Sequence, residues 1–310
     1  MSPPFVSVVI PTHNYGRFIC ETIESALAQS YSPIEIVVVD DGSTDDTPQR
    51  LAVYGHRVRY IYQPNRGVSA ARNNGIAAAR GELIAILDSD DLWLPEKLEQ
   101  QVAVWVREPD SGLVATERFA IDETGRRLDY DKERCSREGF RELTMRDLLE
   151  LPAFSPSSVL ARKDALLAVG GFDEGVIGVE DMEMWVRVAA RFRVLRLNAT
   201  LTAQRFHSKS LSHQTDPMLR NYKKAIDQLF ANVPQLHHRR QWRRIAEARM
   251  YREVAFMRFS DGDRVGALMD LLRSGCRWPL ALRNRQLEMR HLERLKLFLR
   301  YSVARASSQY

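Results

Sequence analysis

Over the first 106 residues, short apolar runs rich in β-branched residues alternate with stretches in which apolar residues recur at helical spacing. Runs of the first kind predict buried strands, and stretches of the second kind predict helices packed on a sheet. The predicted strands are 5–10, 34–39, 58–62 and 83–87, and the predicted helices are 15–29, 47–53, 69–79 and 97–106. This alternation is typical of an α/β fold with a mixed, mostly parallel sheet flanked by helices.

Beyond residue 106 the alternation becomes irregular, and from about residue 217 the pattern is wholly helical. The irregular part predicts a hairpin from 114–121 and 126–130, a loop leading into a strand at 154–160, strands at 193–197 and 201–206, and helices at 143–151, 163–169 and 180–190. The helical part predicts helices at 245–259, 264–272 and, after Pro279, 280–304. We therefore expect an α/β domain at 1–216, with halves at 1–106 and 107–216, and a basic helical region at 217–310.

The composition is that of an ordinary soluble globular chain, with 45% hydrophobic and 27% charged residues. No apolar run approaches the roughly 20 residues that span a bilayer, and the N-terminus lacks the pattern of a signal peptide. The three cysteines, Cys20, Cys135 and Cys276, are far apart and predict neither a disulfide framework nor a CxxC metal site. We therefore expect a cytoplasmic protein, which could also lie peripherally at the inner face of the cell membrane.

The charge is unevenly distributed along the chain. The net charge is +5 and the pI about 9.2, which suggests an anionic partner without naming it. Acidic residues cluster early, whereas the segment after about Asn221 is rich in arginine. No nucleic-acid partner is expected.

The sequence AILDSDDLW at residues 85–93 places three carboxylates directly after a predicted strand. Asp88, Asp90 and Asp91 could simply form a turn and cap the next helix, because an Asp side chain accepts hydrogen bonds from nearby backbone N–H groups. Alternatively they could hold a divalent cation, since crowded carboxylates repel one another and raise one another's pKa unless a cation lies among them. The motif alone leaves both interpretations open.

The predicted topology favours the cation. Ligands of such sheets bind beyond the carboxyl ends of the strands, where 11–14, 40–41 and 88–91 would meet. Asp-x-Asp at this edge offers the oxygen ligands that Mg²⁺ or Mn²⁺ prefer and leaves positions open for phosphate. Arg72 would lie near the same edge with a guanidinium suited to diphosphate oxygens, although an exposed salt bridge explains it equally well.

Other kinds of site lack their sequence signatures. No GxGxxG follows the first strand and no GxxxxGK[ST] loop is present, which argues against dinucleotide-binding and P-loop sites. The acidic stretch 40–46 has its glycine in the wrong place for an EF-hand and no closing Glu. A phosphate-accepting receiver domain is disfavoured, because the first strand ends in Pro-Thr-His-Asn and the acidic trio comes late.

Four stretches, taken jointly and in order, resemble glycosyltransferase family 2. They are SVVIPTHNYGRFICETIESALAQSY, IEIVVVDDGSTDDT, NRGVSAARNNGIAAARGELIAILDSDDLWLPEKL and GVEDMEMWVR. The resemblance covers roughly Ser7 to Ser212. It implies the GT-A fold, a nucleotide-diphosphate sugar as donor, and inversion of configuration at the anomeric carbon.

The resemblance also implies roles for the residues on the nucleotide side. Asp41 would hydrogen-bond the base, with Asp40 supporting the turn, and Arg72 would reach the base or the diphosphate. Asp88 would face the ribose or the sugar. The residues that would border the base are Pro11, Thr12 and Asn14.

On the side of the reaction, the resemblance implies that Asp90 binds Mn²⁺ or Mg²⁺. His207, in the stretch RFHSKSLS, would be a second metal ligand or a diphosphate contact, and Asp91 would help to orient the donor sugar. Asp181 would be the general base that takes a proton from the acceptor hydroxyl, although acidic residues are favoured at a helix start in any case. The nucleoside diphosphate would leave from the opposite face in a single displacement, which inverts the configuration.

By family analogy we expect a UDP-sugar donor, with dTDP and GDP as alternatives. The expected acceptor is a saccharide or lipid-linked saccharide in bacterial surface polysaccharide or glycolipid synthesis. The helices of 217–310 could contact a membrane, cover the domain or form a homodimer. A second hypothesis is a catalytically inactive sugar-nucleotide-binding protein whose helical tail serves membrane or partner docking.

Overall fold

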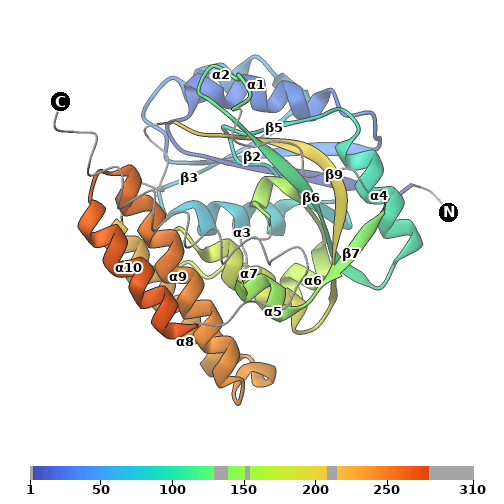
Figure 1. The fold of residues 1–310 in the computed structure, drawn as a ribbon. Coiled ribbons are helices and arrows are strands. Elements are labelled where there is room, and N and C mark those ends of the chain that lie inside the picture. Colours follow the sequence, from blue (N-terminus) through green and yellow to red (C-terminus); the bar gives the residue numbers. More distant parts are fainter. Residues whose placement is uncertain (1–2, 129–138, 151–153, 208–214, 279–310) are drawn as a thin grey trace. The chain divides into compact units, whose positions relative to one another are not determined.

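The computed structural model describes residues 3–128, 139–150, 154–207 and 215–278, and the chain divides into two compact units (Figure 1). One unit consists of 1–148 and 152–207, and the other of 149–151 and 208–310. The last described residue of the first unit is His207, and the predicted end of the α/β domain at residue 216 stays a prediction.

The first half of the sheet is parallel, as the strand–helix alternation predicted. Its strands lie in the order β3-β2-β1-β4. The strands are β1 (Val6–Thr12), β2 (Ile34–Asp41), β3 (Arg59–Gln63) and β4 (Leu83–Ile86). The connecting helices are α1 (Gly16–Leu27), α2 (Thr47–Ala52) and α3 (Val68–Ala78), with a short 3₁₀ turn at Gly55–Arg57.

Helices cover both faces of this half of the sheet, with α1 and α2 on one side and α3 on the other (Figure 1). On the α1 side, Val8 and Ile10 pack in one buried cluster with Ile19 and Ile23. On the α3 side, a Cβ at Gly75 would collide with the side chain of Val9, so glycine lets the helix approach the sheet closely. The parallel strands are therefore apolar on both faces, which explains their continuous β-branched runs.

The second half of the sheet mixes parallel and antiparallel pairs. The order continues β4-β8-β6-β9-β5, and β7 pairs with the free part of β9. Only the β6–β9 pair is parallel among the described pairs of this half. The strands are β5 (Leu92–Trp93), β6 (Ser111–Ile121), β7 (Phe140–Leu143), β8 (Val159–Arg162) and β9 (Arg193–Arg205). The helices are α4 (Lys97–Arg107), α5 (Met145–Glu150), α6 (Lys163–Ala168) and α7 (Glu180–Ala189), with a 3₁₀ turn at Pro156–Ser158.

Two predictions for this half were wrong in detail, and a third is confirmed in part. The two strands predicted at 193–197 and 201–206 form one strand, β9, because β6 pairs with residues 193–196 and again with residues 200–205. The predicted hairpin is confirmed in part: Ile121 and Arg127 form an antiparallel bridge, and residues 129–130 of its second strand lie outside the described residues. The start of the predicted helix at 143–151 is instead the end of β7, because Leu143 pairs with Val194 of β9.

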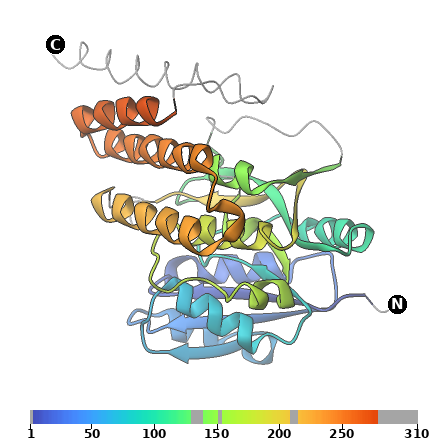
Figure 2. The same ribbon diagram turned by 90° about the horizontal axis from the view of Figure 1, so that it is seen from below.

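The second unit is helical where it is described, as the sequence predicted. It contains α8 (Thr215–Asn232), a 3₁₀ turn (Pro234–Leu236), α9 (Arg240–Ser260) and α10 (Arg264–Arg277), and α9 and α10 lie side by side (Figure 2). Asp263 caps α10, because its Oδ1 accepts a hydrogen bond from Gly266 N at 2.9 Å. The helix predicted at 280–304 lies outside the described residues. Within the described part of the chain, no helix has the length and apolar character needed to cross a membrane.

Candidate functional site

The candidate site lies at the carboxyl edge of the parallel strands, where β1, β2 and β4 run into polar residues. Thr12 at the end of β1 pairs in register with Asp40 of β2, and Pro11 pairs with Val39. Pro11 and Thr12 are buried, and the Thr12 hydroxyl has no hydrogen-bond partner within the described residues. Because buried hydroxyls are usually paired, this oxygen marks a point where a ligand could supply the missing partner.

Asp41 holds the turn that leads from β3 into α3. Its Oδ1 accepts hydrogen bonds from Gln63 Nε2 at 2.7 Å and Arg66 N at 2.9 Å, and its Oδ2 accepts one from Gly67 N at 2.8 Å. Gly67 has a φ of 92°, which glycine adopts without strain. An ionised carboxylate has about four acceptor positions, so Asp41 retains one for the predicted contact with a base.

Asp40 is wholly buried and supports the same edge from inside. Its Oδ1 accepts a hydrogen bond from Ser43 N and its Oδ2 accepts one from the Tyr60 hydroxyl, both at 2.8 Å. Burial, together with the Asp40 charge, raises the pKa of Tyr60 above its ordinary value, so this hydroxyl keeps its proton. Asp40 thus supports the turn, as the resemblance implied.

Asn14 ties the loop after β1 to the loop after β2. It lies in the left-handed region with a φ of 59°, which Asn tolerates better than most residues. Its Oδ1 accepts hydrogen bonds from Thr44 N at 2.7 Å and Asp45 N at 3.2 Å, and its own N–H donates to Ser43 Oγ at 2.9 Å. The amide oxygen therefore shapes the site, and the predicted place of Asn14 beside a base stays a prediction.

The three carboxylates of the acidic turn have different surroundings. Asp88 and Asp90 keep 26% and 17% of their side-chain surface exposed, whereas Asp91 is 2% exposed. Asp91 accepts hydrogen bonds from Ser157 Oγ at 2.6 Å and from Arg205 N at 2.8 Å. Burial, and the nearby charges of Asp90 and Asp88, raise the pKa of Asp91 well above its ordinary value. Asp91 is thus an internal support of the turn, whereas the other two carboxylates are partly exposed.

Asp90 and His207 come together although they are far apart in the sequence. Asp90 Oδ2 and His207 Nε2 lie 3.0 Å apart. The His207 side chain is 4% exposed, and its ring packs against Tyr15 and Phe18 of the α1 region, with centroid distances of 5.7 and 5.2 Å. The packing fixes the imidazole with one nitrogen directed at the Asp90 carboxylate.

Arg72 connects the acidic turn to the start of α7. Its two terminal nitrogens donate to Asp88 Oδ1 and Glu180 Oε1, each at 2.7 Å, and the side chain is 4% exposed. Burial disfavours the charge of Arg72, but the two carboxylates outweigh it and raise the pKa of Arg72 above its ordinary value. Arg72 therefore orients Asp88 and Glu180, and its predicted contact with the base or diphosphate stays a prediction.

Asp181 lies in the first turn of α7, directly after Glu180. It is half-buried, and its Oδ1 accepts a hydrogen bond from Met182 N at 2.6 Å. Because Arg72 joins Glu180 to Asp88, the helix start that carries Asp181 is held next to the acidic turn. The predicted role of Asp181 as the general base stays a prediction.

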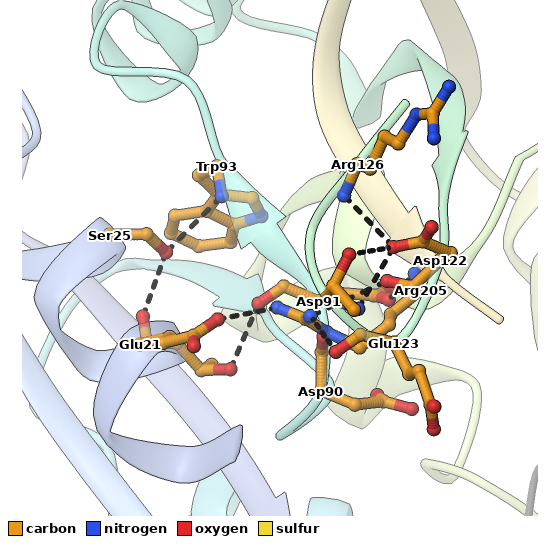
Figure 3. A network of polar contacts seen from close by, with 11 residues as sticks. Glu21, Ser25, Asp90, Asp91, Trp93, Asp122, Glu123, Arg126 and Arg205 are labelled. Atoms are coloured by element: carbon orange, nitrogen blue, oxygen red, sulfur yellow. Dashed lines mark hydrogen bonds and ion pairs between the residues drawn. The ribbon is translucent and has the colours of Figure 1, made fainter. Parts of the chain in front are cut away.

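Sequence reasoning missed two residues that hold the acidic turn in place. Ser157 Oγ donates to Asp91 and accepts a hydrogen bond from Asp88 N at 3.1 Å, and the Ser157 carbonyl accepts one from Trp93 Nε1 at 2.6 Å. Arg205 Nε donates to the carbonyl of Asp90 at 2.8 Å (Figure 3). The only sequence signal for Arg205 was its position in the stretch that contains His207.

The residues present fit a divalent cation held by two protein ligands. Asp90 and His207 offer a carboxylate oxygen and an imidazole nitrogen within reach of each other, a donor set that Mn²⁺ accepts. Among the described residues, no group of three or more His, Cys, Asp or Glu side chains could hold a metal ion. A cation here would need further ligands from phosphate or water, as is common for Mg²⁺ in nucleotide sites.

Comparison with known proteins identifies a family that covers the sheet and the acidic turn. The family described as Glycosyl transferase family 2 matches residues 7–170. An uncharacterized glycosyltransferase of Rickettsia conorii is 33% identical over 214 residues, which cover 66% of this chain and 34% of the relative. The chain thus spans about a third of the length of this curated relative.

Two solved structures share the fold. S. aureus TarS (residues 1–349) in complex with UDP superposes with a TM-score of 0.65 at 20% identity, covering 98% of this chain and 92% of that chain. A mannosyltransferase of Pyrobaculum calidifontis in complex with GDP-Man and Mn²⁺ gives a TM-score of 0.60 at 21% identity, covering 99% and 88%. At these identities the similarity shows the fold alone, which is the expected GT-A fold.

Proposed function

Because the chain belongs to glycosyl transferase family 2, we propose that it transfers a sugar from a nucleoside-diphosphate donor to an acceptor hydroxyl with inversion at the anomeric carbon. The observation that carries the proposal is the Asp90–His207 pair beside Asp88 at the carboxyl edge of the sheet. These side chains lie where ligands bind in such folds, and they converge from segments distant in the chain. Asp41 and Thr12, on the neighbouring strands, would receive the base.

We propose UDP as the nucleotide part of the donor. S. aureus TarS carries UDP in a structure of the same fold, whereas the Pyrobaculum mannosyltransferase carries GDP-Man, so the fold alone leaves both bases open. The remaining acceptor position on the buried Asp41 carboxylate would take the N–H of uracil.

Mn²⁺ or Mg²⁺ bound by Asp90 and His207 would neutralise the charge that develops on the departing diphosphate. Asp88, held by Arg72, would orient the ribose or the sugar beside it. Asp181 would accept the proton of the acceptor hydroxyl as that oxygen forms its bond to the anomeric carbon. The bond to the diphosphate oxygen breaks on the opposite face, so the configuration inverts in one step.

The acceptor is proposed by class only. A saccharide or lipid-linked saccharide in cell-envelope polysaccharide or glycolipid synthesis would fit a cytoplasmic enzyme at the inner face of the membrane. The competing hypothesis is a binding protein without turnover. The intact set of Asp88, Asp90, His207 and Asp181 supports the enzyme.

A thermal-shift panel tests the donor and the cation together. UDP-, dTDP- and GDP-sugars are each added with and without Mn²⁺, and the released nucleotide is then assayed for the best ligand. We expect a UDP-sugar to raise the melting temperature most, and more with Mn²⁺ than without it, because ligands stabilise the state they bind. Asp90→Asn is the matched variant. It should lose only the part of the melting-temperature shift that depends on Mn²⁺. No shift with any nucleotide sugar in the parent protein would reject the proposal.

A further inference from the structure

Arg205 joins four segments at the acidic turn, and it does so almost without exposure to solvent. Its side chain is 1% exposed. Nε donates to the Asp90 carbonyl at 2.8 Å, Nη1 donates to the Glu123 carbonyl at 3.0 Å, and Nη2 donates to Glu21 Oε2 at 2.7 Å. Its backbone N–H donates to Asp91 Oδ1 (Figure 3).

Arg205 differs from Arg72 in the groups of the acidic turn that it binds. Arg205 reaches the backbone of Asp90, and the carboxylate that it pairs with is Glu21 of α1. The guanidinium also lies over the Phe18 ring, 4.7 Å from its centroid, which anchors it to the same helix. Arg205 therefore fixes the backbone of Asp90 without occupying the Asp90 carboxylate, which can still bind a ligand.

The turn after β6 is the second anchor. Arg205 Nη1 contacts the carbonyls of Asp122 and Glu123, at 3.5 and 3.0 Å, in a turn closed by Gly125, whose φ is 84°. Asp122 Oδ1 accepts hydrogen bonds from the N–H groups of Thr124 and Arg126, so this turn has a defined shape of its own. A planar guanidinium with donors in fixed directions suits such a three-way junction, and a lysine ammonium does not.

We propose that Arg205 is a positioning residue for the cation site: it clamps the Asp90 backbone between α1 and the turn 122–125 and so presents the Asp90 carboxylate to a diphosphate-bound cation. This inference rests on the proposed function. Groups that orient a metal ligand typically change metal affinity about 10–100-fold when they are removed. Arg205 should therefore act on the cation and leave the binding of the nucleotide itself unchanged.

The test measures Mn²⁺ and UDP separately. Free Mn²⁺ is followed by electron paramagnetic resonance in the presence of saturating UDP, and metal-free UDP binding by calorimetry. We expect Arg205→Gln to weaken Mn²⁺ binding about 10–100-fold, Arg205→Lys to lie between it and the parent, and metal-free UDP affinity to be unchanged. Arg193→Gln is the control, because Arg193 lies at the other end of β9 and pairs with Glu108 and Glu142.

Gly125→Ala changes the turn that Arg205 contacts. This variant replaces Arg205→Gln in the test if Arg205→Gln fails to fold. Its Cβ would lie 3.9 Å from Arg205 Nη1, which is ordinary contact, but the positive φ strains the turn that Arg205 holds. A smaller loss of Mn²⁺ affinity in the same direction would support the inference. Mn²⁺ affinity unchanged in a folded Arg205→Gln or in Gly125→Ala would overturn it, whereas a parent protein that binds no Mn²⁺ with UDP would overturn the proposed cation site as well.

Discussion

At the scale of single residues, neighbouring carboxylates in this site have different roles, which follow from how deeply each one is buried. Asp91 and Asp90 are neighbours in sequence, but Asp91 is enclosed by Ser157 and the Arg205 backbone, whereas Asp90 faces His207. Within the acidic turn, the buried carboxylate is bound by its own chain and supports structure, whereas the partly exposed one can bind a ligand. The same distinction separates Glu180, which pairs with Arg72, from the half-buried Asp181.

Asp181→Asn should separate binding from turnover. The substitution keeps the size of the side chain but removes its ability to accept a proton, so we expect transfer to fall by about 10²–10⁴-fold, the usual contribution of a general base. Donor affinity, measured by calorimetry with the nucleotide sugar, should stay at the parental value. Transfer at the parental rate would show that another group is the base.

At the scale of elements, α4 is anchored to the sheet by a buried lysine. Lys97 is wholly enclosed; its Nζ donates to Gln101 Oε1 at 2.8 Å and lies 4.0 Å from the centroid of the Trp93 ring. Gln101 Nε2 in turn donates to the carbonyls of Val114 and Ser158, at 2.7 and 2.9 Å. These contacts connect α4 with β5, β6 and the turn that supports the acidic residues. Among the described residues, no carboxylate pairs with Lys97.

Lys97 should make stability depend on pH. Burial lowers the pKa of Lys97 well below its ordinary value, whereas in the unfolded chain it is about 10.4. Between the two pKa values the unfolded state binds more protons, so the free energy of unfolding rises with pH by up to about 1.4 kcal/mol per unit.

Lys97→Met removes this titration while keeping an unbranched side chain. Relative to the variant, the parent protein should therefore gain stability as the pH rises toward 10, measured by urea unfolding at several pH values. A constant difference in free energy of unfolding across that range would contradict the depressed pKa.

At the scale of the whole molecule, the helical unit is basic, but many of its arginines are paired internally. Arg258 pairs with Asp216, Asp263 and Asp270. Arg243 pairs with Asp227 and Glu247. Along one face of α10, Val265, Met269 and Leu272 are exposed, at i, i+4 and i+7. Paired arginines attract anionic lipid weakly, so we expect the apolar residues of this region to be covered by protein.

Sedimentation of the chain with anionic liposomes tests this expectation, and removal of residues 279–310 separates the contribution of the basic C-terminal residues from that of α10. Sedimentation with anionic liposomes should be the same for the full chain and for the chain that ends at Trp278, because neither would depend on lipid contact. Neutral liposomes provide the control for nonspecific association. A loss of sedimentation specific to anionic liposomes on truncation would show instead that the region docks on a membrane.

The sequence by itself determined the order of the elements in the first half of the sheet, the family, and the strand ends at which the polar residues gather. These follow from local signals: β-branched runs, helical spacing, and motifs contained within a few residues. The same local signals assigned the end of β7 to a helix and divided β9 into two strands. Both errors arise because pairing with distant strands decides where β7 and β9 begin and end.

Only the tertiary structure decided which side chains meet. The approach of His207 to Asp90, the bridge of Arg72 between Asp88 and Glu180, and the junction at Arg205 each join residues separated by long stretches of chain. Burial also distinguished the enclosed Asp91 from the partly exposed Asp88 and Asp90. Such contacts depend on how strands and helices pack in three dimensions, and local sequence patterns do not determine that packing.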